Sequence, residues 1–267
     1  MKLGVIGCGK MATALVKGAI SNGVVAAEDV IGVARSEESR TRFSEATGGE
    51  ASADISDVVG RSDVLLLATK PNDLATVLKA GELGKFPEKL LISVVAGVTL
   101  EAIQGLTSDA CKIARTMPNT PSLIGKGAAG FCLGARCEES DRELVRSILN
   151  AVGLCVELPE KLMNAVTGVS GSGPAYIYMV IEALADGGVR AGLPREDAIK
   201  LAAQTVSGAA EMVISTGLHP AVLKDMVTSP GGTTIAGLAA LEKRGVRSAF
   251  IEAVAASAGR AEELGKS

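Results

Sequence analysis

The chain has 267 residues, of which 47% are hydrophobic, so it is long and apolar enough to form one large domain or two ordinary ones. A net charge of −3 and only 2% aromatic residues exclude the usual basis for binding nucleic acid or an anionic membrane surface. Five scattered cysteines without a C-x-x-C pair, and a single histidine, predict no metal site and fit thiols that stay reduced. No signal peptide or membrane-spanning run is apparent, so the sequence predicts a cytoplasmic protein.

Short apolar runs alternate with helical patterns through the first half. This alternation predicts an α/β fold with a Rossmann-like, doubly wound parallel sheet. The predicted strands are Lys2–Ile6, Val30–Val33, Val64–Ala68, Leu90–Val94, Lys112–Thr116, Ala128–Leu133 and Cys155–Glu157. The predicted helices between them are Met11–Asn22, Glu37–Ala46, Asn72–Ala80, Leu100–Leu106 and Glu139–Val152.

The pattern becomes entirely helical after Glu157, which predicts a nucleotide-binding domain over 1–158 and a helical domain over 159–267. The second domain is rich in alanine and glycine, whose side chains bury little area each. Tightly interleaved helices from two subunits would bury more of them, although a single-chain bundle is an equally open alternative. The predicted helices are Pro174–Ala191, Arg195–Thr216, Thr233–Lys243 and Val246–Leu264.

A dinucleotide-binding fingerprint, Gly7-Cys-Gly-Lys-Met-Ala12, directly follows the first strand. In the pattern G-x-G-x-x-G/A the first glycine permits a tight turn, and the second lets the backbone approach a pyrophosphate. The third small residue keeps helix and strand close. A plain strand-to-helix turn is the weaker alternative, so we expect a nucleotide site here.

The end of the second strand indicates which cofactor is preferred. An NAD enzyme usually presents Asp or Glu there to the ribose 2′-hydroxyl, but this chain has no acid before Glu37. Arg35 can pair with a 2′-phosphate and Ser36 can donate a hydrogen bond to it. The sequence therefore predicts NADP(H) in preference to NAD(H), against the alternative that Arg35 is a solvated loop charge.

Three further turns follow strands at the edge where ligands bind in such sheets. Two of them are Ala68-Thr-Lys-Pro71, whose Lys70 can reach a ribose or pyrophosphate, and Val95-Ala-Gly97. The third, Arg115–Pro121, offers the Asn119 amide in a rigid turn that can equally be structural.

The segment Ser229-Pro-Gly-Gly-Thr-Thr234 precedes a predicted helix. Gly231 and Gly232 let backbone N–H groups converge, and Thr233 or Thr234 is expected to cap the helix. Such a helix N-terminus favours a carboxylate, and a capping turn without a ligand is the alternative.

A second small-residue segment, Val166–Tyr176, is expected to present backbone N–H groups in the same way, or else to serve helix packing.

The chain offers no nucleophile–base pair, since its single histidine, His219, lies at a predicted helix boundary. Alcohol oxidation would need such a base, but hydride transfer to a protonated C=N bond mainly needs alignment and a hydroxyl near the nitrogen. The sequence therefore favours a reductase of a small, carboxylate-bearing imine.

With these segments taken together, the chain resembles the pyrroline-5-carboxylate reductase family over essentially its whole length. The resemblance implies NAD(P)H-dependent reduction of 1-pyrroline-5-carboxylate to L-proline, the last step of proline biosynthesis. It also implies a homodimer with interlocked helical domains, sometimes assembled further into a decamer. The matching motifs are Gly7–Ala12, Ala68–Pro71, Arg115–Pro121, Val166–Tyr176, Ala183–Gly188, Gly192–Pro194 and Leu223–Ile235.

Matching positions carry the family's site residues over to this chain. Ile55 and Met226 replace an Asn of some relatives, so those two contacts are not transferred. The hydroxyl of Thr234 would face the ring nitrogen, as the catalytic contact. The implied substrate contacts are Glu160, Ser229, Gly231, Gly232, Thr233 and Thr234, and the predicted cofactor contacts are Gly7, Cys8, Gly9, Lys10, Met11, Arg35, Ser36, Thr69, Lys70, Pro71, Ala96 and Gly97.

Two rival functions share this layout. A β-hydroxyacid dehydrogenase would need a lysine after its glycine-rich segment, where this chain has Ile177. A non-catalytic NADP(H)-binding sensor is the second rival, because fold alone does not determine function, and the intact Ser229–Thr234 segment counts against it.

Overall fold

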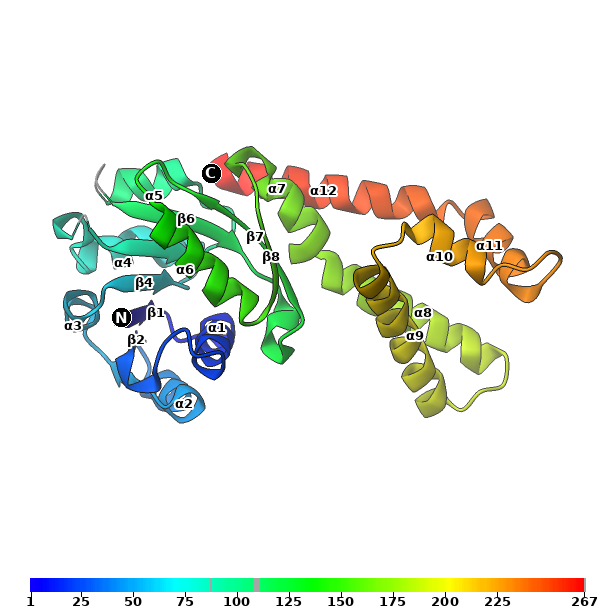
Figure 1. Cartoon of the computed structure of the whole chain (residues 1–267), viewed down its shortest axis with the longest axis horizontal. Coiled ribbons are helices and arrows are strands. Elements are labelled where there is room, and N and C mark those ends of the chain that lie inside the picture. Colours follow the sequence, from blue (N-terminus) through cyan, green and yellow to red (C-terminus); the bar gives the residue numbers. More distant parts are fainter. Residues whose placement is uncertain (87, 108–110, 267) are drawn as a thin grey trace. The chain divides into compact units, whose positions relative to one another are not determined.

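The computed structural model describes residues 1–86, 88–107 and 111–266, which form two compact units (Figure 1). The first unit comprises Met1–Ser172 and the chain from Ala255 on, and the second comprises Gly173–Val254. This division falls after the domain boundary expected at 158/159, because the intervening segment packs on the first unit. Met163 is buried there, and Val166 lies so close to Gly130 that a Cβ at that glycine would be 2.8 Å from its side chain.

One eight-stranded sheet forms the centre of the first unit, in the order β3-β2-β1-β4-β5-β6-β7-β8. The neighbouring strands pair in parallel except β6 and β7, which pair antiparallel. The predicted doubly wound parallel sheet is therefore confirmed, with one antiparallel pair in it. The strands are β1 Leu3–Ile6, β2 Val30–Val33, β3 Glu50–Ser52, β4 Val64–Leu67, β5 Leu90–Ser93, β6 Lys112–Met117, β7 Gly127–Leu133 and β8 Gly153–Glu157.

The antiparallel pair follows from the length of its connection. A parallel neighbour needs a crossover of a dozen or more residues, usually a helix. Between β6 and β7 the chain has only a short turn with the 3-10 segment Thr120–Ile124, so β7 reverses direction. A full helix then separates β7 from β8, and these two strands are parallel again.

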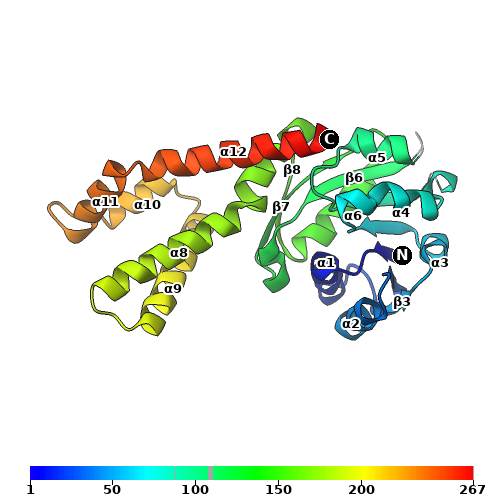
Figure 2. The ribbon, with the colours of Figure 1, turned by 180° about the vertical axis from the view of Figure 1, so that it is seen from behind.

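Helices cover both faces of the sheet, as a doubly wound fold requires. Alternate residues of β4 enter opposite cores: Val64 and Leu66 pack with α1, α2 and α6, while Leu65 and Leu67 pack with α3, α4 and α5. Figure 1 shows α6 in front of the sheet. Figure 2, seen from the opposite side, shows α4 in front. These helices are α1 Lys10–Ser21, α2 Glu37–Thr47, α3 Ile55–Arg61, α4 Leu74–Ala80, α5 Leu100–Leu106 and α6 Glu139–Asn150.

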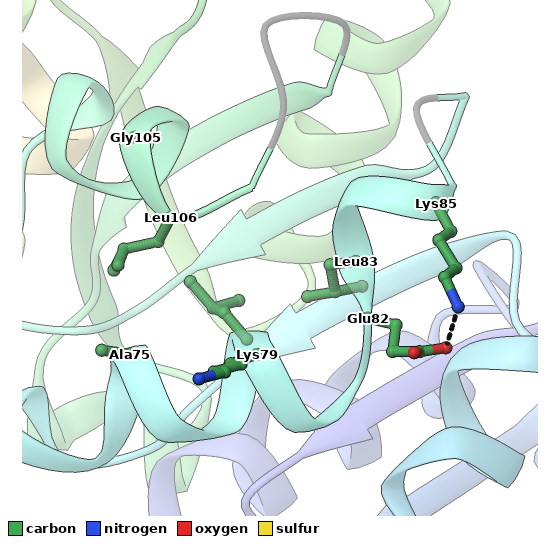
Figure 3. A pocket seen from close by; sticks show the side chains of 8 residues that line it. Ala75, Lys79, Glu82, Leu83, Lys85, Gly105 and Leu106 are labelled. Carbon is green, nitrogen blue, oxygen red and sulfur yellow. Dashed lines mark hydrogen bonds and ion pairs between the residues drawn. The ribbon is translucent and has the colours of Figure 1, made fainter.

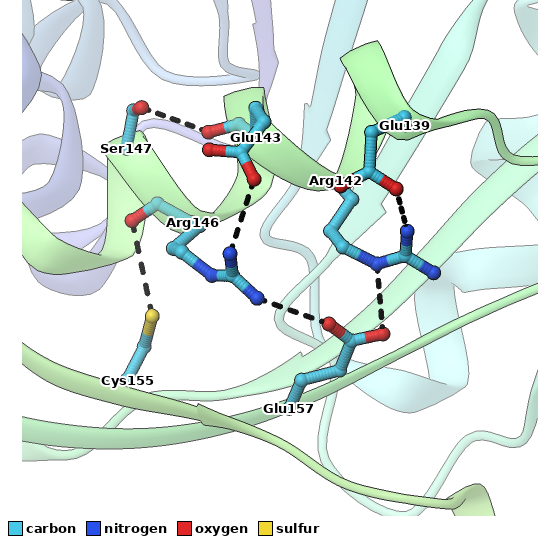
Figure 4. A network of polar contacts seen from close by, with 7 residues as sticks. All are labelled: Glu139, Arg142, Glu143, Arg146, Ser147, Cys155 and Glu157. Atoms are coloured by element: carbon cyan, nitrogen blue, oxygen red, sulfur yellow. Dashed lines mark hydrogen bonds and ion pairs between the residues drawn. The ribbon is translucent and has the colours of Figure 1, made fainter.

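The edge strand β8 is held to α6 by an ion-pair network (Figure 4). Glu157 accepts from Arg142 Nε at 3.1 Å through one oxygen and from Arg146 Nη2 at 3.3 Å through the other. On the opposite side of this strand, Leu154 and Val156 are exposed. They line an apolar groove of about 350 Å³ with residues of β7 and the segment 162–170.

Of the two roles that the sequence left open for the segment Val166–Tyr176, the structure supports helix packing rather than free backbone N–H groups. Helix α7 (Met163–Val166) runs through a π-helical stretch, Thr167–Gly171, into helix α8 (Gly173–Arg190). The N–H of Ser172 donates to the Thr167 carbonyl at 2.8 Å, so the helical bonding continues through the segment. A Cβ at Gly171 would be 2.7 Å from the Met117 side chain, so this glycine permits close packing.

The second unit is helical throughout and buries very little of its apolar surface. Its core consists of Ala185, Ala198 and Ala202, at the contact between α8 and α9. No helix of the described residues is both long and apolar enough to cross a membrane. The other helices are α9 Arg195–Thr216, α10 Pro220–Met226, α11 Thr233–Lys243 and α12 Val246–Lys266, the last of which ends in the first unit.

Candidate functional site

A cavity of about 700 Å³ lies at the carboxyl ends of β1, β2 and β4. This edge is where open α/β sheets bind nucleotides. The cavity brings together three segments that the sequence analysis selected separately. Of the predicted cofactor residues, Gly7, Cys8, Gly9, Arg35, Ser36, Thr69 and Lys70 line it.

The fingerprint turn has the backbone geometry that a pyrophosphate needs. Gly7 has φ +100°, and a Cβ there would be 2.7 Å from the Ala68 carbonyl oxygen, so only glycine fits without strain. Gly9 is the N-cap of α1, no side chain caps that helix, and a Cβ at Gly9 would meet no protein atom within 4 Å. The bare face of Gly9 and the N-terminus of α1 therefore leave room for an anion.

Two side chains in the cavity bear on what it can hold. The Thr69 hydroxyl is buried and has no hydrogen-bond partner among the described residues, which is costly unless a ligand supplies one. Burial raises the pKa of the Cys8 thiol to about 12, with a smaller opposing effect of Arg40. The thiol is therefore neutral at physiological pH and adds no negative charge beside a pyrophosphate.

The end of β2 presents one arginine to the cavity, and an acid pairs with it. Arg35 Nη2 lies 3.1 Å from Asp73 Oδ2, and the Arg35 side chain is 90% exposed. Ser36 is the N-cap of α2, where its Oγ accepts from the N–H of Ser39. Asp73 lines the cavity although it lies outside the predicted set, and so do Ser39, Arg42 and Ile55.

The remaining predicted cofactor residues are not part of the lining of this cavity. Lys10 and Met11 form the first turn of α1, and Pro71 begins the 3-10 turn before α4. Ala96 and Gly97 lie in the loop after β5, where Gly97 has φ +77°. The lining of the cavity therefore comes mainly from the segments that follow β1, β2 and β4.

Glu160 belongs to the first unit, where its carboxylate already has two partners. Its Oε1 accepts from the backbone N–H of Leu100 at 2.7 Å and from Arg115 Nη1 at 3.0 Å. The other implied substrate residues all lie in the second unit. The structure thus gives Glu160 an environment different from the rest of that set.

Helix α11 begins as expected at Thr233, but neither threonine caps it. The N-cap is Gly232, which makes no side-chain cap, and Thr233 and Thr234 are the first helical residues. The preceding turn is closed by the Gly232 N–H donating to the Ser229 carbonyl, with Gly231 at φ +66°. A helix N-terminus without a side-chain cap, beside two threonine hydroxyls, is suited to bind a carboxylate.

Two other predicted features have structural roles. The Asn119 side chain donates to the Ser170 carbonyl at 2.9 Å and accepts from the Ala128 N–H at 2.9 Å, so it ties the turn after β6 to its neighbours. His219 is the N-cap of α10, and its Nδ1 accepts from the Ala221 N–H at 3.2 Å, which confirms the predicted helix boundary.

A second pocket, of about 430 Å³, lies between α4 and α5 (Figure 3). Its lining is largely apolar, with Lys79 and the ion pair Glu82–Lys85 as its charged groups. It contains none of the predicted site residues and no unpartnered buried polar group of the described chain. This second pocket therefore lacks the features of a nucleotide site that the larger cavity has.

Comparison with known proteins is consistent with this geometry. Residues 160–264 match the family model described as pyrroline-5-carboxylate reductase dimerisation, and residues 2–97 match the model described as NADP oxidoreductase coenzyme F420-dependent. A pyrroline-5-carboxylate reductase of Synechocystis is 49% identical over 267 residues, covering 100% of this chain and 99% of the relative.

Solved structures of the same family match over almost the full length. One is a pyrroline-5-carboxylate reductase from Coxiella burnetii, 36% identical with a TM-score of 0.94, covering 100% of this chain and 99% of that one. Another is the Plasmodium falciparum pyrroline carboxylate reductase with NADP bound, 32% identical with a TM-score of 0.89, covering 99% and 98%. This chain therefore belongs to the pyrroline-5-carboxylate reductase family.

Proposed function

We propose that this chain reduces the C=N bond of 1-pyrroline-5-carboxylate to give L-proline, with NADPH preferred over NADH. The observation that carries the proposal is the union of three strand-end segments in one cavity, with the bare face of Gly9 and the unpartnered Thr69 hydroxyl. Both features leave room and hydrogen-bonding capacity for a dinucleotide. Full-length similarity to pyrroline-5-carboxylate reductases supports the substrate.

In this proposal the first unit binds the cofactor, which supplies a hydride when bound. The Gly7–Ala12 turn and the N-terminus of α1 hold its pyrophosphate, and Thr69 and Lys70 bind beside them. Arg35 and Ser36 bind the 2′-phosphate, for which Arg35 exchanges its partner Asp73. Lys10, Met11, Pro71, Ala96 and Gly97 complete the contacts from the neighbouring turns.

The second unit binds the imine through its carboxylate. The turn from Ser229 to Gly232 and the N-terminus of α11 hold the carboxylate, with Thr233 contributing a hydroxyl. Thr234 Oγ1 hydrogen-bonds the ring nitrogen, which lies next to the carbon that bears the carboxylate. A hydride supplied to the carbon of the C=N bond would then give proline, with the proton kept on the nitrogen.

The domain division at 158/159 and the assembly are part of the same proposal. Residues 1–158 hold the cofactor, and 159–267 hold the substrate and form a homodimer; a decamer is the larger assembly to test. The five cysteines are all free thiols, which favours a reducing compartment, and we propose the cytoplasm.

The test is the loss of NADPH absorbance when 1-pyrroline-5-carboxylate is added to purified protein, repeated with NADH. We expect oxidation of both with NADPH preferred, and proline as the product. Oxidation with NADH preferred would retain the reaction and refute the 2′-phosphate site. Protein that binds NADPH but does not turn over would refute the reaction.

A further inference from the structure

The carboxylate of Glu160 lies between two parts of the first unit that are distant in sequence. It follows β8 and begins a 3-10 turn, Glu160–Leu162. One oxygen, Oε1, accepts from both the Leu100 N–H at 2.7 Å and Arg115 Nη1 at 3.0 Å. Glu160 therefore connects the start of α5 to β6.

Arg115 depends on this carboxylate because its guanidinium is buried. Its side chain is 8% exposed, and it lies on β6 between β5 and β7. Breaking a buried pair by removing one partner leaves an uncompensated charge, which is strongly destabilising. Within the described part of the chain, Glu160 is the carboxylate paired with Arg115.

Leu100 is the first residue of α5 and directly follows the loop that carries Ala96 and Gly97. The beginning of this loop is held locally: Val94 N–H donates to the Leu67 carbonyl at 2.9 Å, and Val95 N–H donates to Ser93 Oγ. At its end, Thr99 caps α5 by accepting from the Ala102 N–H at 3.1 Å, and Glu160 accepts from the next N–H, that of Leu100, from sixty residues further along the chain. Glu160 thus adds the long-range contact that links this end of the loop to the rest of the first unit.

The same loop has close packing on another side. Gly97 has φ +77°, and a Cβ at Gly265, near the end of α12, would be 2.8 Å from the Gly97 carbonyl oxygen. A loop fastened at both ends and packed this closely has little freedom to move. Its backbone position therefore depends on the few contacts that fasten it.

We propose that Glu160 is a positioning residue for the cofactor loop Val95–Thr99, acting through Leu100 and Arg115. The inference rests on the proposed cofactor role of Ala96 and Gly97. This role is separate from the substrate contact that the family resemblance implies for Glu160. The two roles predict effects on different ligands.

The experiment compares Glu160→Gln and Glu160→Ala with a matched pair, Glu157→Gln and Glu157→Ala. Glu157 is three residues earlier, is 31% exposed against 32% for Glu160, and also pairs with arginines, but those hold β8 to α6 (Figure 4). NADPH fluorescence titrations without imine give the Kd for NADPH. Steady-state rates then give KM for each substrate, and thermal melts report folding.

We expect Glu160→Ala to raise the Kd for NADPH roughly tenfold, because a charge-assisted hydrogen bond to the loop is lost. Glu160→Gln keeps a carbonyl acceptor for Leu100 and should have a smaller effect on Kd. The Glu157 variants should bind NADPH like wild type.

An unchanged NADPH Kd in a folded Glu160→Gln and Glu160→Ala pair would overturn the proposal, and so would an effect confined to the KM of the imine. Equal weakening of NADPH binding by the Glu157 variants would also overturn it, since the effect would then be general. Failure of the wild-type protein to bind NADPH is a separate result, which would refute the proposed cofactor site itself.

Discussion

Arg35, the residue proposed to select the cofactor, combines high exposure with a weakly competing partner. An exposed ion pair such as Arg35–Asp73 contributes little stability, so the guanidinium can exchange the carboxylate for a phosphate at small cost. A 2′-phosphate carries more charge and more acceptor oxygens than Asp73. Asp73 thus provides Arg35 with a partner in the absence of phosphate and competes with phosphate for it.

Reversing this charge should change the cofactor preference. Arg35→Glu is expected to raise KM for NADPH roughly tenfold or more and to leave KM for NADH near wild type, because only NADPH has the 2′-phosphate. Steady-state rates with each cofactor measure this. The control is Arg61→Glu, which reverses another exposed, ion-paired arginine outside the cavity. A NADPH/NADH ratio that moves equally in both variants would refute the role of Arg35.

Thr234 is the second residue whose role can be tested by itself, because its hydroxyl can be removed with little change of shape. Thr234→Val keeps the shape of the side chain and removes the proposed hydrogen bond to the ring nitrogen. We expect kcat to fall about ten- to a hundredfold with KM for NADPH within twofold, and Thr234→Ser to retain most of the rate. Rate measurements at saturating NADPH decide this. Wild-type turnover by Thr234→Val would remove the hydroxyl from the mechanism.

At the scale of elements, the turn between β1 and α1 contains one glycine that the fold requires and another that the proposed cofactor site requires. Gly7 is needed for the fold, since its φ is positive and the Ala68 carbonyl lies close, whereas Gly9 has an ordinary φ of −81° and open space beside it. An alanine at Gly9 therefore adds a methyl group that meets no protein atom within 4 Å. That methyl group would occupy the space proposed for the pyrophosphate.

Gly9→Ala should consequently fold like wild type and bind NADPH at least roughly tenfold more weakly, because the backbone can no longer approach the phosphates. Thermal melts and NADPH titration give the two quantities. Gly60→Ala in α3, where a Cβ also meets nothing within 4 Å, serves as the control and should leave NADPH binding unchanged. Normal NADPH affinity in Gly9→Ala would place the pyrophosphate elsewhere.

Elements with strong periodicity and clear end signals could be predicted from the sequence almost to the residue. Strand β2 and helices α5, α9 and α11 have the predicted bounds. Strand β3 was missed because Glu50–Ser52 has three residues and no apolar run, and α3 because its seven residues show too little periodicity. The direction of β7 depends on the length of a connection, which the strand's own composition does not reveal.

The candidate site could also be predicted only where its residues belong to a local motif. The fingerprint Gly7–Ala12 could be located because its function depends on local backbone geometry. Asp73 and Arg42 were missed because neither belongs to a motif: Asp73 ends the 3-10 turn that begins at Pro71, Arg42 lies within α2, and only the folded chain shows that both line the cavity. The pairing of Glu160 with Leu100 and Arg115 likewise requires β8 to be folded beside β7.

At the scale of the whole molecule, the second unit cannot account for its own stability. Its core of three alanines buries little apolar area, while Met179, Leu201 and Ile214 are 62%, 58% and 75% exposed. Apolar burial contributes about 25 cal/mol per Å², so helices that leave such residues in water gain little from folding alone. A second copy of the same unit can cover these residues, which agrees with the match to a dimerisation family.

This argument predicts that a charge at Ile214 prevents assembly. Ile214→Glu should shift the protein from dimer to monomer and lower activity, since a buried unpaired carboxylate costs several kcal/mol, enough to raise the dimer Kd more than a hundredfold. Light scattering across a dilution series measures the mass. Ile124→Glu is the matched control, because Ile124 is similarly exposed, at 79%, but lies in the first unit. A dimer of wild-type affinity in Ile214→Glu would show that α9 is not covered by a partner at this residue, and the exposed helices would then need another explanation for their stability.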